Sequence, residues 1–177
     1  MVRPGFCVWL TGLPSAGKTT LAKKLTLMLE ARGRRVTMLD GDAVRAHLSA
    51  GLGFSREDRD MNVLRIGWVA SQIAFHGGAV VCAVVSPYEE ARERVRALFP
   101  NHEFVLVHVD TPARVCEARD AKGMYAKARA GVIRGFTGVD DPYERPVNPE
   151  LRIDTDGSNP DINGQRILQF LEDEKIF

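Results

Sequence analysis

The sequence predicts an α/β fold, a three-layer sandwich in which helices cover both faces of a parallel sheet. Runs such as 79–85 and 104–109 are almost wholly apolar, as expected for strands buried on both faces. They alternate with segments whose apolar residues recur at helical spacing, which is typical of right-handed crossovers between parallel strands. The 177 residues suffice for one domain with a sizeable core, and we expect it to span 1–177.

A glycine-rich stretch after the first expected strand, 6–10, fits the phosphate-binding pattern G-x-x-x-x-G-K-[ST]. It consists of Gly12, Leu13, Pro14, Ser15, Ala16, Gly17, Lys18 and Thr19, followed by Thr20. Apolar residues at helical spacing come directly after it, so the motif has the strand–loop–helix context that it requires. Backbone N–H groups of such a loop bind phosphate, the lysine reaches the outer phosphates, and the Thr19 hydroxyl can ligate Mg²⁺. The sequence therefore predicts a P-loop fold of the nucleoside triphosphate hydrolase or kinase type.

The next elements follow from local signals. The first helix is expected to end near Arg32, because Gly33 supplies a C-terminal stop. A second strand at 35–39 ends at Asp40, and a short helix then runs through Leu48. Ser55, with an acidic residue three positions on, predicts the start of a long helix that Gly77-Gly78 terminates.

Residues 79–85 form the third expected strand, which ends at Ser86. Ser86-Pro87-Tyr88 is expected to open a charged helix through Leu98, and we interpret its charges from Glu89 to Arg96 as a solvated face. Ser86 has two interpretations of equal weight: a cap of this helix, or a hydroxyl in the functional site.

The fourth expected strand, 104–109, ends at Asp110, and Pro112 fits the first turn of another helix. A short last strand at 151–154 precedes an amphipathic helix capped by Asn159. Between them, 120–149 shows little periodicity and carries several basic residues, as a functional loop or lid would.

Ligands of parallel sheets bind at the carboxyl ends of the strands, where Asp40 and Asp42 are expected. With the usual sheet order, both would lie one strand away from the P-loop. A carboxylate there can hold Mg²⁺ through water or accept a proton from an attacking hydroxyl. Asp42 has a second interpretation, as the cap of the short helix that follows it.

Several side chains on the next two helices suit an anionic, ring-bearing substrate. Asp42 and Arg45 share a spacing of three residues, as do Arg59 and Asn62, so each pair shares a helix face. Arginines directed toward the strand ends would clamp an anion, although each of these residues taken alone is more often a solvated surface residue. Phe54 could stack on a purine or fill the core.

Composition sets further bounds. The formal net charge is +1, which gives no argument for a nucleic-acid or membrane partner, and no apolar run approaches the roughly 18 residues of a membrane helix. The first strand begins at Phe6, which leaves no room for a signal peptide. Cys7, Cys82 and Cys116 lack metal-ligand or C-x-x-C spacing and are expected to be buried thiols of a reducing, cytoplasmic environment.

Four stretches outside the P-loop, at 39–45, 51–62, 122–131 and 135–144, are long and idiosyncratic. Together they resemble the adenylylsulfate kinase (APS kinase) family, and the resemblance runs from about Phe6 to Leu151. It implies transfer of the terminal phosphate of MgATP to the 3′-hydroxyl of adenosine 5′-phosphosulfate, giving 3′-phosphoadenylylsulfate and ADP. It implies a homodimer, and leaves open whether the chain is associated or fused with the ATP sulfurylase that makes the substrate.

The resemblance also implies roles for individual residues. Residues at the positions of Arg45, Phe54, Arg59, Asn62 and Phe136 bind adenylylsulfate, and the two phenylalanines sandwich its adenine. Asp40 is the residue expected to deprotonate the 3′-hydroxyl, with Lys18 neutralising phosphate charge and Asp42 close to magnesium and substrate.

Lys122 matches a lysine near the transferred phosphate, and Arg119 a residue that packs on the ATP adenine. Ser86 matches a serine described as a phosphorylated intermediate. In-line transfer needs positioning and charge neutralisation rather than a covalent serine, so we expect Ser86 to contact substrate instead.

Two other functions fit part of the pattern. Another small P-loop kinase, acting on a sugar or nucleoside monophosphate, would also use arginines and aromatic rings. A non-catalytic nucleotide sensor would bind ATP without turning it over. The presence of Gly17, Lys18, Thr19 and Asp40 argues against this function.

Overall fold

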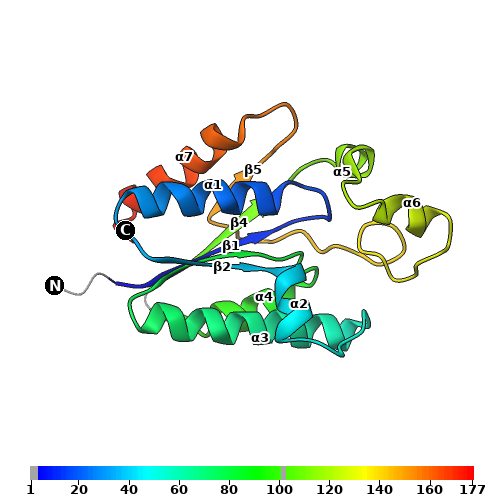
Figure 1. Cartoon of the computed structure of the whole chain (residues 1–177), viewed down its shortest axis with the longest axis horizontal. Coiled ribbons are helices and arrows are strands. Elements are labelled where there is room, and N and C mark those ends of the chain that lie inside the picture. The colour runs from blue at the N-terminus through cyan, green and yellow to red at the C-terminus, as the bar shows by residue number, and fades with distance from the viewer. Residues whose placement is uncertain (1–3, 101–102) are drawn as a thin grey trace.

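A five-stranded parallel sheet forms the centre of the protein in a computed structural model that describes residues 4–100 and 103–177 (Figure 1). The strands lie in the order β2-β3-β1-β4-β5. Their bounds are β1 (Phe6–Thr11), β2 (Val36–Asp40), β3 (Ala79–Ala83), β4 (Phe104–Val109) and β5 (Leu151–Ile153). All neighbouring strands pair in parallel, as predicted.

Helices cover both faces of the sheet, which confirms the three-layer architecture (Figure 1). One face carries α1 (Lys18–Ala31) and α7 (Pro160–Asp173), and the other carries α3 (Arg56–Phe75) and α4 (Glu89–Arg96). The shorter helices α2 (Gly41–His47), α5 (Ala113–Arg119) and α6 (Met124–Arg129) lie toward the carboxyl ends of the strands.

The central strand β1 is covered on both of its faces, which explains why its sequence is apolar from Phe6 to Leu10. Phe6, Val8 and Leu10 pack in the core beneath α1 and α7, whereas Cys7 and Trp9 pack in the core beneath α3 and α4. Every residue of β1 is fully buried, because side chains of a strand alternate between two covered faces.

Most helix ends lie where the capping and stop residues of the sequence predict them. Ser55 caps α3 by accepting a hydrogen bond from the Asp58 N–H, Asn159 caps α7, and Gly33 follows α1 in a left-handed conformation (φ 78°). The cap assigned to Asp42 is wrong, because the Asp40 carboxylate caps α2 by accepting from the Asp42 N–H (3.1 Å).

Two helices also begin later than predicted. The helix expected from Ser86 begins at Glu89 after Tyr88, so Ser86 is not its cap, and α5 begins directly after Pro112. Residues 120–149, expected to lack periodicity, contain the single short helix α6.

The position of β2 differs from the prediction. β3 lies between β2 and the P-loop strand β1, so Asp40 is two strands away from the loop rather than one. Local patterns predict parallel crossovers and their handedness, but not the position at which each strand joins the sheet.

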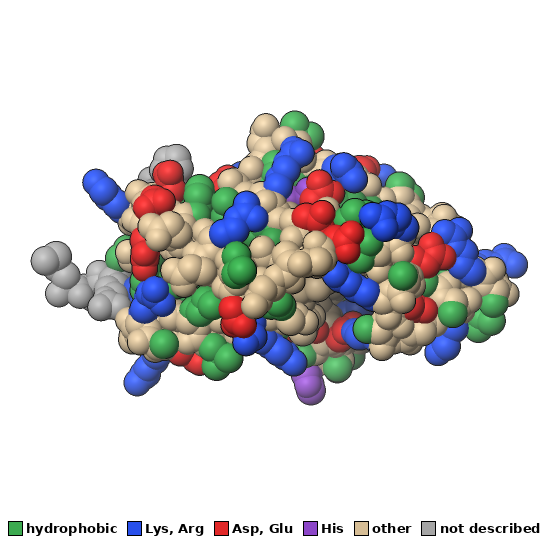
Figure 2. Space-filling view, turned by 90° about the horizontal axis from the view of Figure 1, so that it is seen from above, with side chains coloured by type: hydrophobic (Ala, Val, Ile, Leu, Met, Phe, Trp, Pro, Cys, Tyr) green, Lys and Arg blue, Asp and Glu red, His purple; other side chains and the backbone are tan. Residues whose placement is uncertain are grey.

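The surface of the molecule carries charges of both signs. Lys and Arg side chains alternate with Asp and Glu over the face formed by α1 and α7 (Figure 2). Within the described residues, no helix is both long enough and apolar enough to cross a lipid bilayer.

Arg92 corrects the prediction of a fully solvated helix face on α4. Its side chain is completely buried, donates to the Ser86 carbonyl and ion-pairs with Glu89, and donates to the Glu144 carbonyl (2.7 Å). The Glu144 N–H in turn donates to the Pro87 carbonyl (2.8 Å). Arg92 therefore connects the end of β3 with the segment that returns from 120–140, a non-local contact that helical spacing does not reveal.

We expect Arg92→Met to lower the free energy of unfolding by about 3 kcal/mol, because it leaves Glu89 and two buried carbonyl groups without their partner. Urea denaturation measures the change. Arg94→Met on the exposed side of the same helix is the matched control and should shift the free energy by less than about 0.5 kcal/mol. Equal effects of the two substitutions would contradict the structural role of Arg92.

Candidate active site

A cavity of about 1180 Å³ opens at the carboxyl ends of the strands, beside the P-loop. It gathers most of the predicted site residues into one wall: Pro14, Ser15, Gly17, Lys18, Thr19, Thr20, Asp40, Asp42, Arg45, Phe54, Arg59, Asn62, Ser86, Arg119, Lys122 and Phe136. Gly12, Leu13 and Ala16 do not line it, and Leu13 instead lines a smaller neighbouring cavity of about 230 Å³. The sequence-predicted residues therefore converge on a single cavity, apart from these three members of the loop.

The P-loop presents an uncapped helix N-terminus to this cavity. Gly17 precedes α1 in a left-handed conformation (φ 98°), and no side chain caps the helix there. Ser15 is also left-handed (φ 61°), which bends the loop backbone. Unpaired N–H groups and the helix dipole at such a terminus attract anions.

Lys18 lies buried in the loop that it is expected to serve. Its Nζ donates to the carbonyl oxygens of Gly12 (2.9 Å) and Leu13 (2.7 Å). Burial lowers the pKa of Lys18 to about 8, although the nearby Cys116 and Asp40 oppose the shift. A phosphate would replace the carbonyl oxygens with a charged acceptor and so favour the ammonium form.

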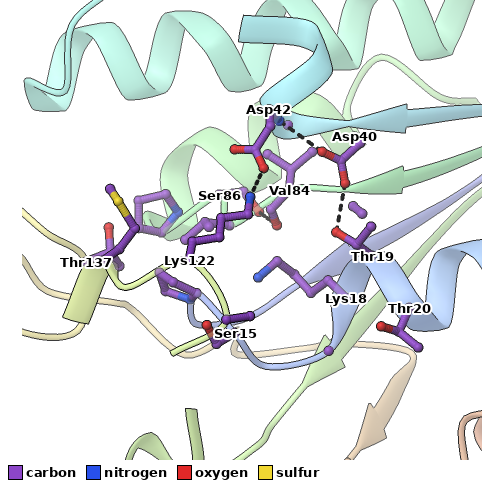
Figure 3. Close-up of a pocket in the computed structure, with 18 of the residues that line it drawn as sticks. Ser15, Lys18, Thr19, Thr20, Asp40, Asp42, Val84, Ser86, Lys122 and Thr137 are labelled. Atoms are coloured by element: carbon purple, nitrogen blue, oxygen red, sulfur yellow. Dashed lines mark hydrogen bonds and ion pairs between the residues drawn. The ribbon is translucent and has the colours of Figure 1, made fainter. Parts of the chain in front are cut away.

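A chain of polar contacts joins the loop to the end of β2 (Figure 3). The Thr19 hydroxyl donates to Asp40 Oδ2 (2.8 Å), and the other oxygen of Asp40 accepts from the Asp42 N–H. Asp42 forms an ion pair with Lys122, from the segment between α5 and α6. Thr19 reaches Asp40 across the intervening strand because it lies in the first turn of α1, which packs on β3 and β2.

These oxygen atoms suit a hard cation. Mg²⁺ binds proteins through one or two oxygen ligands and completes its shell with phosphate oxygens and water, and Thr19 and Asp40 supply a hydroxyl and a carboxylate side by side. The described residues hold no group of three or more His, Cys, Asp or Glu side chains placed to bind a metal alone.

Two arginines and an exposed ring form another part of the wall. The Arg45 guanidinium lies 4.6 Å from the centre of the Phe54 ring, and Arg59 lies 5.6 Å from it. Phe54 is 60% exposed, which shows that it is not a core plug. Burial, followed by repulsion from Arg59, lowers the pKa of Arg45, so an anion between them would relieve an existing strain of like charges.

Asn62 and Phe136 complete this part of the cavity. Asn62 is 4% exposed, and its Oδ1 has no hydrogen-bond partner among the described residues, although buried amides are normally paired. Phe136 packs edge-on against Tyr125, at 5.0 Å between ring centres, and the Tyr125 hydroxyl donates to the Pro14 carbonyl (3.1 Å). The P-loop and the ring of Phe136 are thus linked through one tyrosine.

The Ser86 hydroxyl is already occupied by protein groups. It accepts from Trp9 Nε1 (3.0 Å) and donates to Thr11 Oγ1 (2.9 Å), and the side chain is almost fully buried. Ser86 also has a left-handed backbone (φ 39°), which is uncommon for a residue with a side chain. Its hydroxyl therefore serves first as a structural link at the end of β3.

Sequence reasoning missed two threonines near the loop. Arg119 donates to the hydroxyl (2.8 Å) and the carbonyl (2.7 Å) of Thr155, and the hydroxyls of Thr155 and Thr111 both lie against the Ala16 carbonyl. Each threonine comes two residues after the end of a strand. The strand-end rule that selected Asp40 could therefore have selected both.

Comparisons with known proteins show similarity in sequence and in overall fold. The family model described as Adenylylsulphate kinase matches residues 4–154. An adenylyl-sulfate kinase of Rippkaea orientalis is 48% identical, over 98% of this chain and 94% of its own. Among solved structures, an APS kinase of Mycobacterium tuberculosis in complex with AMPPNP and APS superimposes with a TM-score of 0.92 at 42% identity, covering 96% of this chain and 99% of its own. A hexameric APS kinase of Thiobacillus denitrificans gives 0.76 at 42% identity, and covers 99% of this chain and 30% of its own.

The shifted pKa of Lys18 predicts how nucleotide affinity depends on pH. Because phosphate binding requires the ammonium form, the affinity for ADP should be constant from about pH 7 to 8 and then weaken by up to about tenfold per pH unit. Calorimetric titration with ADP at several pH values measures this break.

Lys18→Arg is the matched control, since a guanidinium stays charged over this range. Whatever the size of its affinity for ADP, this variant should show no break near pH 8. A wild-type affinity that stays constant up to about pH 10 would contradict the assignment of Lys18 to the phosphate.

Proposed function

The chain belongs to the adenylylsulfate kinase family, and we infer that it transfers the terminal phosphate of ATP to the 3′-hydroxyl of adenosine 5′-phosphosulfate. The products are ADP and 3′-phosphoadenylylsulfate. One observation carries this function: the P-loop and the wall of Arg45, Phe54 and Arg59 line the same cavity. A cavity of about 1180 Å³ has room for two nucleotides that meet at the transferred phosphate.

We propose that the P-loop amides and Lys18 hold the phosphates of ATP. Mg²⁺, when bound beside Thr19 with Asp40 or Asp42 at hand, would neutralise charge on the β- and γ-phosphates and orient them for in-line transfer. Lys18 and Lys122 would place cationic charge next to the transferred group. Because phosphoryl transfer has little covalent chemistry, such positioning and neutralisation account for most of the catalysis.

Asp40 is the residue that we assign to the acceptor hydroxyl. Its carboxylate lies at the junction of the P-loop and α2, close to both Thr19 and Asp42. From there it would accept the proton of the 3′-hydroxyl as the oxygen attacks phosphorus. Asp42 would orient Lys122, with which it is already paired.

The remaining contacts would select adenylylsulfate. Arg45 and Arg59 provide two guanidinium groups for its anionic phosphosulfate, and Asn62 offers an unpaired buried amide oxygen to a donor on the base or sugar. Phe54 and Phe136 both line the cavity and would stack on the adenine. Arg119, which donates to the Thr155 carbonyl, would pack on the adenine of ATP.

Residues 120–149 would act as a lid over this single kinase domain. The segment contributes Lys122 and Phe136 to the cavity wall. Near its C-terminal end, Glu144 is held against the start of α4, because its carbonyl accepts from Arg92 and its N–H donates to the Pro87 carbonyl. A lid closed over both nucleotides excludes water, which would otherwise hydrolyse ATP.

We also propose a cytoplasmic homodimer. Met61, Trp68 and Phe75 recur every seven residues on α3 and are 46%, 59% and 76% exposed, an apolar stripe that a second copy would cover. All three cysteines are buried free thiols, in keeping with a reducing compartment. The association with ATP sulfurylase stays a prediction from the resemblance.

Release of ADP should depend on adenylylsulfate. A coupled ADP assay with and without this substrate measures it, and a panel of sugars and nucleoside monophosphates tests the rival kinase activities. Asp40→Asn should lower kcat by roughly 100-fold or more, because the acceptor hydroxyl loses its proton acceptor. Calorimetry with ADP controls for intact binding in this variant. ADP release that is the same with and without adenylylsulfate would contradict the proposed reaction.

Ser86→Ala should leave phosphoryl transfer largely intact. We expect kcat to fall by less than roughly tenfold, because no covalent serine is needed for in-line transfer. Stability should fall by about 1–3 kcal/mol, since the Trp9 N–H loses its buried acceptor. Complete loss of turnover with ADP binding retained would instead support a phosphoserine intermediate.

A further inference from the structure

The peptide bond between Ala16 and Gly17 is held on one side by two threonine hydroxyls. Thr111 Oγ1 lies 3.0 Å and Thr155 Oγ1 2.8 Å from the Ala16 carbonyl oxygen, and the two hydroxyls are 2.8 Å apart. Thr111 follows β4 and Thr155 follows β5, so both lie far from the P-loop in the sequence. The carbonyl of Ala16 is thus fixed by the two threonines, and Ala16 itself is fully buried and does not line the cavity, although Thr155 does.

In a trans peptide the C=O and the following N–H point in opposite directions. With the Ala16 carbonyl fixed to the threonines, the Gly17 N–H must face the other way. Gly17 lines the cavity, and no group of the described residues accepts a hydrogen bond from its N–H. A peptide turned over at this position would present an oxygen, rather than a donor, to a phosphate.

We propose that Thr111 and Thr155 are positioning residues of the phosphate site, which set the orientation of the Ala16–Gly17 peptide and so direct the Gly17 N–H at the nucleotide. This inference rests on the proposed use of the P-loop by ATP. It assigns a function to two residues that follow β4 and β5 rather than to the loop itself.

The bonding of Thr155 supports a defined orientation. Its hydroxyl has one hydrogen, which it donates to the Ala16 carbonyl, and its oxygen accepts from Arg119 Nη1 (2.8 Å). Thr111 is 3% exposed, and its hydroxyl donates either to the Ala16 carbonyl or to the Thr155 hydroxyl oxygen. A glycine is also needed at position 17. A Cβ there would lie 3.3 Å from Thr155 Oγ1, and the backbone φ of 98° is unfavourable for any residue with a side chain.

Arg119 extends this arrangement toward the adenine side of the cavity. It donates to both the hydroxyl and the carbonyl of Thr155. The phosphate loop and the residue assigned to the ATP adenine therefore share one threonine. A test must separate an effect through the peptide from an effect through Arg119.

The test compares Thr155→Val, which keeps the shape but removes the hydroxyl, with Thr155→Ser, which restores the hydroxyl. Calorimetry with inorganic tripolyphosphate and with ADP measures binding. We expect Thr155→Val to weaken both ligands about tenfold, and Thr155→Ser to stay within about twofold of the wild type. In the kinase assay the KM for ATP should rise in Thr155→Val while the KM for adenylylsulfate does not.

Two further variants complete the design. Thr111→Val leaves the contact between Arg119 and Thr155 in place and should also weaken tripolyphosphate, and it carries the test if Thr155→Val does not fold. Arg119→Ala should weaken ADP but not tripolyphosphate. Melting temperatures show that each variant is folded.

The results distinguish the possible failures. Wild-type affinity for tripolyphosphate in folded Thr155→Val and Thr111→Val would overturn the inference. Loss of ADP affinity alone in Thr155→Val would also overturn it, because the effect would then act through Arg119. If the wild-type protein bound neither ADP nor tripolyphosphate, the proposed phosphate site itself would be wrong, and the inference with it.

Discussion

The hydrogen bond between Thr19 and Asp40 is the contact on which the geometry of the site depends. The P-loop and the end of β2 belong to strands separated by β3, so sheet pairing alone does not bring them together. One carboxylate does, because Asp40 accepts from Thr19 at the start of α1 and caps α2 with its other oxygen. The start of α2, and with it the position of Arg45 in its last turn, is therefore held by the same carboxylate that accepts from Thr19 next to the phosphate loop.

The cations of the site already have oxygen partners in the protein. Lys18 donates to two loop carbonyls, Lys122 pairs with Asp42, and Arg59 donates to Thr137 (2.9 Å). Substrate binding must exchange these partners for phosphate or sulfate oxygens, so the net gain is the difference between two sets of contacts. A water molecule competes poorly in such an exchange, whereas a multiply charged anion competes well. The arrangement therefore favours a polyanionic ligand over solvent without leaving buried charges unpaired.

Prediction from sequence succeeded where the determining interactions are local. Ser55 and Asn159 cap their helices through N–H groups two or three residues away, and the P-loop is a contiguous motif. The sequence also placed most of the site residues in one cavity, because strand ends and helix faces share an edge of the sheet. It failed for the order of β2 and β3 and for the burial of Arg92, both of which depend on segments more than 40 residues apart.

The case of Ser86 shows why geometry must accompany a resemblance. Sequence position left a helix cap, a substrate contact and a phosphorylated intermediate as interpretations of the same residue. The structure gives its hydroxyl two buried partners, Trp9 and Thr11, on the central strand. A serine that attacked phosphorus would have to leave both and expose the Trp9 N–H without an acceptor, a cost that direct transfer to the substrate hydroxyl avoids. The left-handed backbone of Ser86 then has a structural reason: it turns the hydroxyl toward the core and its carbonyl toward Arg92. The residue at the end of β3 thereby joins the core strand to the base of the segment that we assign as the lid.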